Sequence, residues 1–220
     1  GSNNCTNWGS IGIFSGSWGG SYTLRTTGGW SFLGAAASYG ASSAAIAAID
    51  GQPHVLHARA MAGSAGLFDE ARITPDAWAP ATVDDGDLVY RGTHASVGEI
   101  ASDRAFVVHA NSNAQGARLV RWESGTWGAP TDLPPVANVD VDALAAGASA
   151  GRGYVLYHDS KNGQVHMLSE TLSGWKDETV VGKSVSPDIS IAVGAARELF
   201  VSWHDDVLGA IMVSRKRDCD

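Results

Sequence analysis

The sequence is poor in charge, in cysteine and in long apolar runs. Charged residues make up only 17% of the 220 residues, and the 15 Lys and Arg are outnumbered by 23 Asp and Glu, for a net charge of -8. Binding to nucleic acid or to an anionic membrane surface needs clustered cations, so we expect neither partner. Because no apolar run reaches the ~18 residues of a membrane-spanning helix, we also expect no membrane insertion.

Hydrophobic residues make up 44% of the chain, which is enough to build a core, and the chain also contains 27 Gly and eight Trp. Tryptophan outnumbers phenylalanine, of which there are five, and this suggests one structural position used repeatedly. The chain begins Gly1-Ser2, which is typical of a cloning remnant. We therefore expect any signal peptide to have been removed.

An internal repeat is marked by four tryptophans at intervals of 48, 49 and 48 residues: Trp30, Trp78, Trp127 and Trp175. Between them the same order recurs, with a run rich in small residues, a β-type apolar run, an alternating run and then the Trp segment. Turn signals such as Asp50-Gly51 separate the runs. Each unit is therefore predicted to form four short antiparallel strands.

Four strands in a period of about 40 to 50 residues are typical of a propeller blade. We predict an all-β fold, a five-bladed β-propeller of four-stranded antiparallel blades, as a single domain over residues 1–220. The small-residue strand is expected innermost and the Trp strand outermost, with its indole on the neighbouring blade. A β-sandwich is the alternative, but it has no reason to repeat at this interval. The blades are predicted at about 11–34, 43–83, 95–132, 141–181 and 188–215, the last completed by 5–10.

The two cysteines lie at opposite ends of the chain, at Cys5 and Cys219. If the ring closes, these ends meet, and a disulfide between them would stabilise the fold by roughly 4 to 5 kcal/mol in the chain-entropy model. The alternative is two unrelated buried thiols. A disulfide would indicate a secreted, periplasmic or cell-surface protein.

Over about residues 11–215 the units resemble the β-propeller repeats of bacterial secreted proteins and of propeller lectins. The closest matches are Tyr157-His-Asp-Ser-Lys-Asn-Gly163-Gln-Val and Ser173-Gly-Trp175. The resemblance implies the propeller fold and is weak for function. Two family signatures, the Asp-box of sialidase-type propellers and the WD dipeptide, are absent from the sequence.

Two motifs that suggest catalysis or metal binding have simpler structural explanations. The Gly-x-Ser-x-Gly pattern around Ser149 falls in a predicted turn between strands, whereas a nucleophile elbow needs a strand, a turn and a helix. His54 and His57 would pair on a helix but point to opposite faces of a strand. His57 aligns with His109, Tyr157 and Trp203, so packing between blades is its expected role.

Polar residues are predicted to gather on one face, where the inner strands begin and the second strands end. Such a cluster is able to bind sugar hydroxyls, a cationic group or a divalent metal, although Asp and His also begin strands and cap turns. The candidate ligand-binding residues on this face are His94, Asp142, Asp188, Asp159 and Asp205. The candidate metal ligands are His94, His158, His204, Asp142 and Asp188; no other cofactor is expected.

A second candidate set is Arg121, Trp122 and Glu123, which combines a guanidinium, an aromatic ring and a carboxylate on a third strand. These side chains recognise a sugar in several propeller lectins, and the resemblance implies the same use here. A solvated strand face is the alternative.

These observations favour a secreted, non-catalytic protein that binds carbohydrate or another small ligand, as a lectin does. One alternative is a glycoside hydrolase of the five-bladed arabinanase-like type, which would need two carboxyls about 5 to 9.5 Å apart, with Asp142 and Asp188 as candidates. A protein-interaction platform is the other.

Overall fold

A computed structural model describes residues 21–26, 29–35, 41–59, 66–74, 77–85, 95–110, 115–182, 185–194 and 197–217 of the chain. These residues form strands and one short 3₁₀ turn, η1 (Pro134–Val136). The strands are β1 (Ser21–Thr26), β2 (Gly29–Ala35), β3 (Ala41–Ile49), β4 (Gln52–Arg59), β5 (Gly66–Thr74), β6 (Ala77–Asp84), β7 (Ala95–Ala101), β8 (Arg104–Ala110), β9 (Ala117–Glu123), β10 (Thr126–Trp127), β11 (Thr131–Asp132), β12 (Val141–Ser149), β13 (Arg152–Asp159), β14 (Gln164–Thr171), β15 (Gly174–Val181), β16 (Val185–Val193), β17 (Glu198–Asp205) and β18 (Ala210–Arg217).

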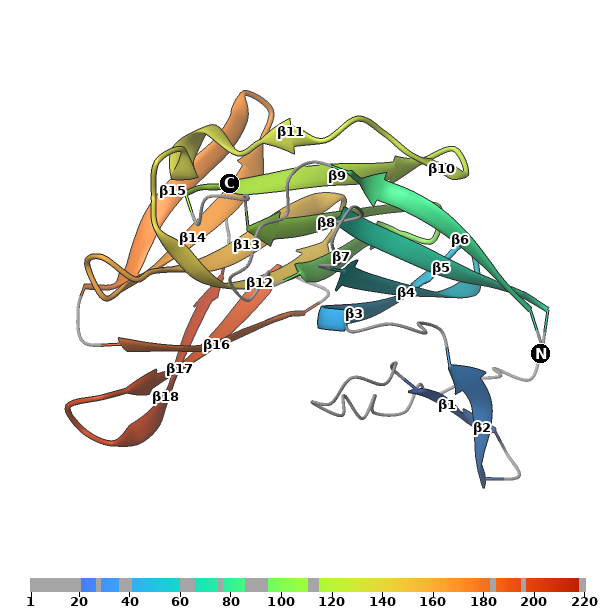
Figure 1. Cartoon of the computed structure of the whole chain (residues 1–220). Coiled ribbons are helices and arrows are strands. Elements are labelled where there is room, and N and C mark those ends of the chain that lie inside the picture. The colour runs from blue at the N-terminus through green and yellow to red at the C-terminus, as the bar shows by residue number, and fades with distance from the viewer. Residues whose placement is uncertain are drawn as a thin grey trace.

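The strands pair into antiparallel sheets that follow one another in chain order (Figure 1). Sheet I is β3 to β6, sheet II is β7 to β10 with β11, sheet III is β12 to β15, and sheet IV is β16 to β18. Strands β1 and β2 form a separate ribbon, which lies on the opposite side of the view from sheet IV. In every sheet the strands are joined in sequence by hairpins, so the predicted antiparallel units are confirmed.

The repeated tryptophans occupy one register position. Trp127 pairs with Trp122, and Trp175 pairs with Glu170, the residue at the same place in the next sheet. Trp30 and Trp78 pair in the same way with Arg25 and Arg72. The Trp strand lies at the outer edge of its sheet, as predicted, and in sheet II it shares that edge with the short strand β11.

The first strands of neighbouring sheets contact one another in succession, from β3 to β7, β12 and β16. Small residues are required there because the sheets converge. A Cβ added to Gly98 of β7 would come within 3.2 Å of the backbone of Gly147 in β12, and one added to Gly147 within 2.6 Å of Val193 Cγ2 in β16. This crowding explains why the predicted inner strands are rich in Ala, Gly and Ser.

Apolar side chains fill the spaces between the sheets. Phe106 and Val108 of sheet II pack with Val155 and Tyr157 of sheet III in one cluster, against which Trp175 lies. Tyr154 and Leu156, on the other side of sheet III, pack with Leu199 and Val201 of sheet IV. Sheets II and III are thus each covered on both faces by neighbouring sheets, which is the packing expected of a stack of blades.

Several predictions concern residues outside the described ranges. Cys5, Cys219, His94 and the predicted closing strand at 5–10 all belong to this group, so the structure does not test the disulfide or the closure of a ring. Sheet IV contains three strands within the described residues, which fits the missing Trp strand of the last unit. Among the described residues, no helix is long and apolar enough to span a membrane.

Candidate functional site

The polar face, defined as the end of the sheets where the first strands begin and the second strands end, carries the predicted carboxylates. Two of them are used by turns. Asp159 accepts hydrogen bonds from the backbone N–H groups of Lys161 and Asn162 and from the Asn162 side chain, at 3.1, 3.3 and 2.6 Å. Asp205 accepts from Val207 and Leu208 N–H, both at 2.9 Å. These two side chains cap the turns between second and third strands.

Asp142 forms a pair with a histidine that the sequence also suggested. Its Oδ1 lies 2.5 Å from Nδ1 of His158, whose side chain is only 5% exposed, while the Asp142 side chain is 41% exposed. The Nε2 atom of His158 is buried without a hydrogen-bond partner among the described residues. The carboxylate therefore fixes the orientation of the imidazole.

The remaining polar-face candidates are more open. His204 Nδ1 lies 3.0 Å from Asp206, and Asp188 accepts a hydrogen bond from Ser186 at 3.3 Å. In the described part of the chain, no three His, Cys, Asp or Glu side chains are placed to hold one metal ion. Of the predicted metal ligands in the described ranges, Asp142 and His158 lie together, whereas His204 and Asp188 contact Asp206 and Ser186.

A buried charge cluster joins sheets I and II at the same face. Asp84, at the end of β6, is 2% exposed and lies 2.9 Å from Nε2 of His109 and 2.8 Å from the Arg118 guanidinium. The other ring nitrogen of His109 lies 3.1 Å from the carbonyl oxygen of Ala110. Both nitrogens of this buried ring therefore lie within hydrogen-bond distance of oxygen atoms, one of a carboxylate and one of a carbonyl.

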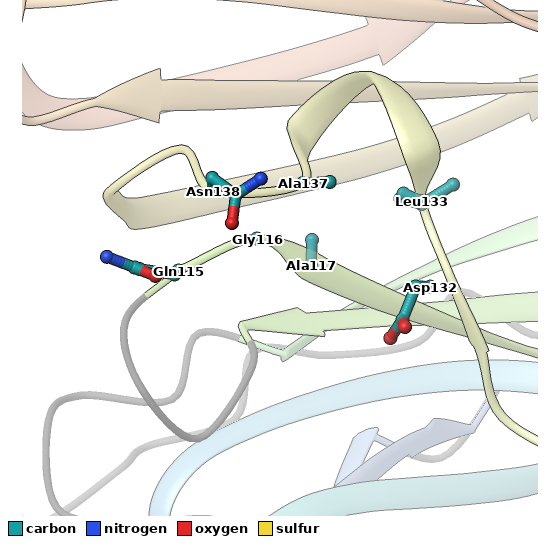
Figure 2. Close-up of a pocket in the computed structure, with 7 residues that line it drawn as sticks. All are labelled: Gln115, Gly116, Ala117, Asp132, Leu133, Ala137 and Asn138. Carbon is teal, nitrogen blue, oxygen red and sulfur yellow. The ribbon is translucent and has the colours of Figure 1, made fainter.

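Next to this cluster is a pocket at the polar end of sheet II (Figure 2). Its volume is about 260 Å³, close to the lower end of the ~300 to 1,000 Å³ range of small-molecule sites. Figure 2 shows Gln115 and Asn138 at one end and Asp132 at the other, below the loop that carries η1. The lining residues are Gln115, Gly116, Ala117, Asp132, Leu133, Ala137 and Asn138.

Backbone hydrogen bonds hold the two walls of this pocket. The N–H of Gly116 donates to Val139 O at 2.7 Å, and that of Leu133 donates to Ala117 O at 2.9 Å. Asn138 adopts a left-handed backbone at φ 68°, a conformation that asparagine tolerates better than most residues. The fixed backbone presents two side-chain amides and a carboxylate to one cavity, a set that both donates and accepts hydrogen bonds.

Asp132 connects the pocket to the buried charge cluster. Its Oδ1 lies 3.5 Å from Nε of Arg118, and its side chain is 75% exposed. Arg118 therefore contacts one buried and one exposed carboxylate, and it brings positive charge to the wall of the pocket.

The structure does not bring Arg121, Trp122 and Glu123 together on one surface. Neighbouring residues of a strand point to opposite faces, and here Arg121 lies 2.5 Å from Glu170 of sheet III, whereas the Trp122 ring lies 5.0 Å from that of His54 in sheet I. Glu123 is exposed. The first two side chains connect sheet II to its two neighbours.

Another buried group between sheets I and II centres on Asp69, which is 1% exposed. Its Oδ2 atom lies 2.7 Å from Nδ1 of His54 and accepts the indole N–H of Trp127 at 2.8 Å. His57, three residues from His54, instead stacks on Phe68 and lies 3.3 Å from Glu70. The two histidines thus have different partners, as the strand geometry predicted.

Tyr157 is buried between sheets II and III, where its hydroxyl donates to Asp177 at 3.2 Å and its ring stacks on His166. Burial raises the pKa of Tyr157 well above its usual range, and the charge of Asp177, the hydrogen bond to it and the charge of Asp159 act in the same direction. The phenol is therefore a neutral hydrogen-bond donor at physiological pH.

Sequence reasoning missed four polar residues of this face: Asp84, Gln115, Asp132 and Asn138. They lie in loops or at strand ends that differ from unit to unit, so the repeat gave them no common position. A local signal was present in Gly116 and Asn138, since Gly and Asn are the residues that most readily take a left-handed backbone at a turn.

Comparison with solved structures identifies the class of fold. The Aleuria aurantia lectin, as a mutant in complex with α-methyl-L-fucoside, superposes with a TM-score of 0.66 at 14% identity, over 90% of this chain and 66% of the lectin. The NanB sialidase of Streptococcus pneumoniae gives 0.59 at 12% identity, over 84% of this chain and 32% of the sialidase. The endo-arabinase of Bacteroides thetaiotaomicron gives 0.50 at 11% identity, over 94% and 88%.

The chain therefore has an all-β architecture of antiparallel sheets that matches β-propeller structures, both lectins and glycosidases. It spans about two thirds of the length of the lectin and about one third of the sialidase. No protein-family model and no curated protein sequence matches it. At these identities the likeness concerns the fold, and the function has to be argued from the site.

Proposed function

We propose that this chain is a non-catalytic, lectin-like protein that binds a carbohydrate in the pocket of Figure 2. The observation that carries the proposal is the lining of that pocket: Gln115 and Asn138, with side-chain amides, and Asp132, with a carboxylate, line a cavity of about 260 Å³. Sugar hydroxyls both donate and accept hydrogen bonds, and this set of groups offers the complementary atoms.

The partners of the polar-face carboxylates support binding rather than hydrolysis. A glycosidase needs one carboxyl as acid and another as base or nucleophile. Here Asp159 and Asp205 cap turns, and Asp84 holds His109 and Arg118. Asp142 is paired with His158. These contacts assign structural work to carboxylates that a hydrolase would need free.

The proposal includes a closed ring of five blades. Sheets I to IV and the β1–β2 ribbon give five units, and the three strands of sheet IV leave an edge at β18 that a strand at residues 5–10 would complete. Closure in this way would bring Cys5 and Cys219 together as a disulfide, in a secreted, periplasmic or cell-surface protein. Mass spectrometry of the non-reduced, proteolysed protein tests this part directly.

The test of the binding site is a glycan array followed by calorimetry with the sugars that it identifies, fucosides included because the similar lectin was solved with one. Asn138→Gly is the informative variant, since glycine accepts the left-handed backbone while the amide is lost. We expect it to weaken binding about tenfold, the effect of one or two lost hydrogen bonds, without lowering the melting temperature.

Asn162→Ala provides the matched control, because Asn162 is an exposed amide on the same face that serves the Asp159 turn rather than the pocket. It should leave sugar affinity unchanged. Absence of binding to any saccharide, or equal loss in both variants, would overturn the assignment of this pocket.

A further inference from the structure

A second cavity opens on the face opposite the polar face, between sheets III and IV. It has a volume of about 450 Å³ and lies against three hairpin turns. Residues 150–152 belong to the first turn of sheet III, residues 170–172 to its last turn, and Arg197 to the first turn of sheet IV. None of these turns contributes to the pocket of Figure 2.

Two arginines, Arg152 and Arg197, line this cavity and approach it from different sheets. Both are partly buried. The one carboxylate in the lining, Glu170, is bound by Arg121 at 2.5 Å and accepts the backbone N–H of Gly153 at 3.0 Å. Its charge is therefore offset by a third guanidinium from sheet II.

The backbone of Arg197 adds an independent observation. It has φ 55°, the left-handed region in which glycine is the favoured residue. In sheets I and III the residue before the second strand is a glycine, Gly51 and Gly151 with φ of 72° and 80°, although the turn of sheet IV is longer and is closed by the Gly194 N–H donating to Glu198 O. An arginine kept where glycine would be less strained indicates that its side chain has a use.

The charges of sheets III and IV are also separated by face. Their polar ends carry mainly aspartates: Asp142, Asp159, Asp188, Asp205 and Asp206. Their opposite ends carry most of the cations of these two sheets: Arg152, Lys176, Arg197, Arg215 and Lys216. Carboxylates also lie toward this end, and two of them, Glu198 and Glu178, are paired with Arg215 and Lys216. Of these cations, Arg152 and Arg197 are the two that line the cavity.

We propose that this cavity is a second binding site, for a small molecule that carries a carboxylate, sulfate or phosphate group. The five N–H donors of a guanidinium form a planar fork that matches the oxygens of such groups, and a side chain already bonded to a protein carboxylate retains further donors. Two forks from opposite sides are able to hold one oxyanion between them. Leu172, which is exposed and lines the cavity, offers an apolar surface against which a ring of the ligand could pack.

The experiment is a calorimetric titration of the full chain with four matched probes: galacturonate, galactose 6-sulfate, galactose 6-phosphate and neutral galactose. We expect at least one charged probe to bind and galactose not to bind at this site. Arg152→Gln and Arg197→Gln should each weaken that binding by about tenfold or more. Lys161→Gln, which removes an exposed cation from the polar face, should have no effect.

Arg197→Gly separates binding from folding. Glycine relieves the left-handed strain, so this variant should keep its melting temperature while it loses the anion. Binding of the anion that survives both glutamine variants would overturn the proposal, as would no binding of any charged probe at millimolar concentration. Because the probes differ from galactose only in the charged group, this result is independent of sugar binding in the pocket of Figure 2.

Discussion

The indole N–H of Trp127 in sheet II donates to Oδ2 of Asp69 in sheet I at 2.8 Å. The same oxygen lies 2.7 Å from Nδ1 of His54, while Oδ1 of Asp69 has no hydrogen-bond partner among the described residues. The repeated tryptophan thus does more than fill the gap between sheets, because in this unit it also stabilises a buried carboxylate of the preceding sheet.

Trp127→Phe tests this relationship. The phenyl ring keeps much of the aromatic packing but removes a donor from a buried carboxylate, which should lower the free energy of unfolding by about 1 to 3 kcal/mol in a urea titration. Trp175→Phe is the control, because the contact recorded for Trp175 is an edge-on ring contact with Phe106 that phenylalanine can keep. Equal losses in the two variants would show that packing alone explains the position.

Asp84→Asn tests the charge cluster at the polar face. The substitution leaves Arg118 and His109 without their buried anionic partner, and we expect a loss of about 3 kcal/mol. Asp132→Asn removes the second, exposed carboxylate from the same arginine and should change stability by less than ~1 kcal/mol. Urea titrations of both variants at low and high salt provide the measurement. If Asp132→Asn lowered the free energy of unfolding as much as Asp84→Asn, the conclusion that the buried carboxylate of Asp84 contributes most of the stability would be wrong.

The sheets could be predicted from the sequence because their signals are local and repeated. The Trp spacing fixed one register position, and the turn glycines fixed the hairpins. The partners across sheets could not be predicted, because Asp84 and Arg118 lie 34 residues apart and nothing in either segment indicates that they meet. Conversely, Arg121 and Trp122 are adjacent in the sequence but do not act together, because neighbouring residues of a strand point to opposite faces. Arg121 contacts sheet III and Trp122 contacts sheet I.

The sequence around Asp159 and Asp205 contained a sign that these residues cap turns, although the same residues could also be interpreted as ligand-binding. Each is followed four residues later by a glycine, Gly163 and Gly209, whose N–H donates to the carbonyl oxygen of the aspartate at 2.8 Å. Both glycines have positive φ, of 62° and 60°. This spacing is that of a capped turn, and it assigns the carboxylates to the hairpin rather than to a ligand.

Gly147→Ala tests the crowding of the inner strands. The added Cβ would lie 2.6 Å from Val193 Cγ2 of the next sheet, so the Val193 side chain or one of the two strands has to shift. Overpacking of this kind should destabilise the protein by about 1 to 3 kcal/mol, measured by urea denaturation. Gly182→Ala, with no atom within 4 Å of the added Cβ, should be neutral within ~0.5 kcal/mol. A neutral Gly147→Ala variant would show that the first strands do not converge as described.

Tyr157 gives the protein an alkaline pH dependence whose sign follows from its environment. Because burial and Asp177 raise its pKa in the folded protein, the folded state keeps the phenol proton at a pH where the unfolded state loses it, above about 10. The unfolded state then binds fewer protons, so the free energy of unfolding falls as pH rises through that range. Spectroscopic titration of tyrosinate absorbance should show a late component from Tyr157 that ionises only on unfolding.

Tyr157→Phe should remove that late component and make the alkaline decline in stability shallower than in the parent protein. At neutral pH it should cost about 1 kcal/mol, because the hydrogen bond to Asp177 is lost while the ring still stacks on His166. An unchanged titration curve in this variant would mean that Tyr157 does not contribute the late component, and that the contact with Asp177 does not protect its proton.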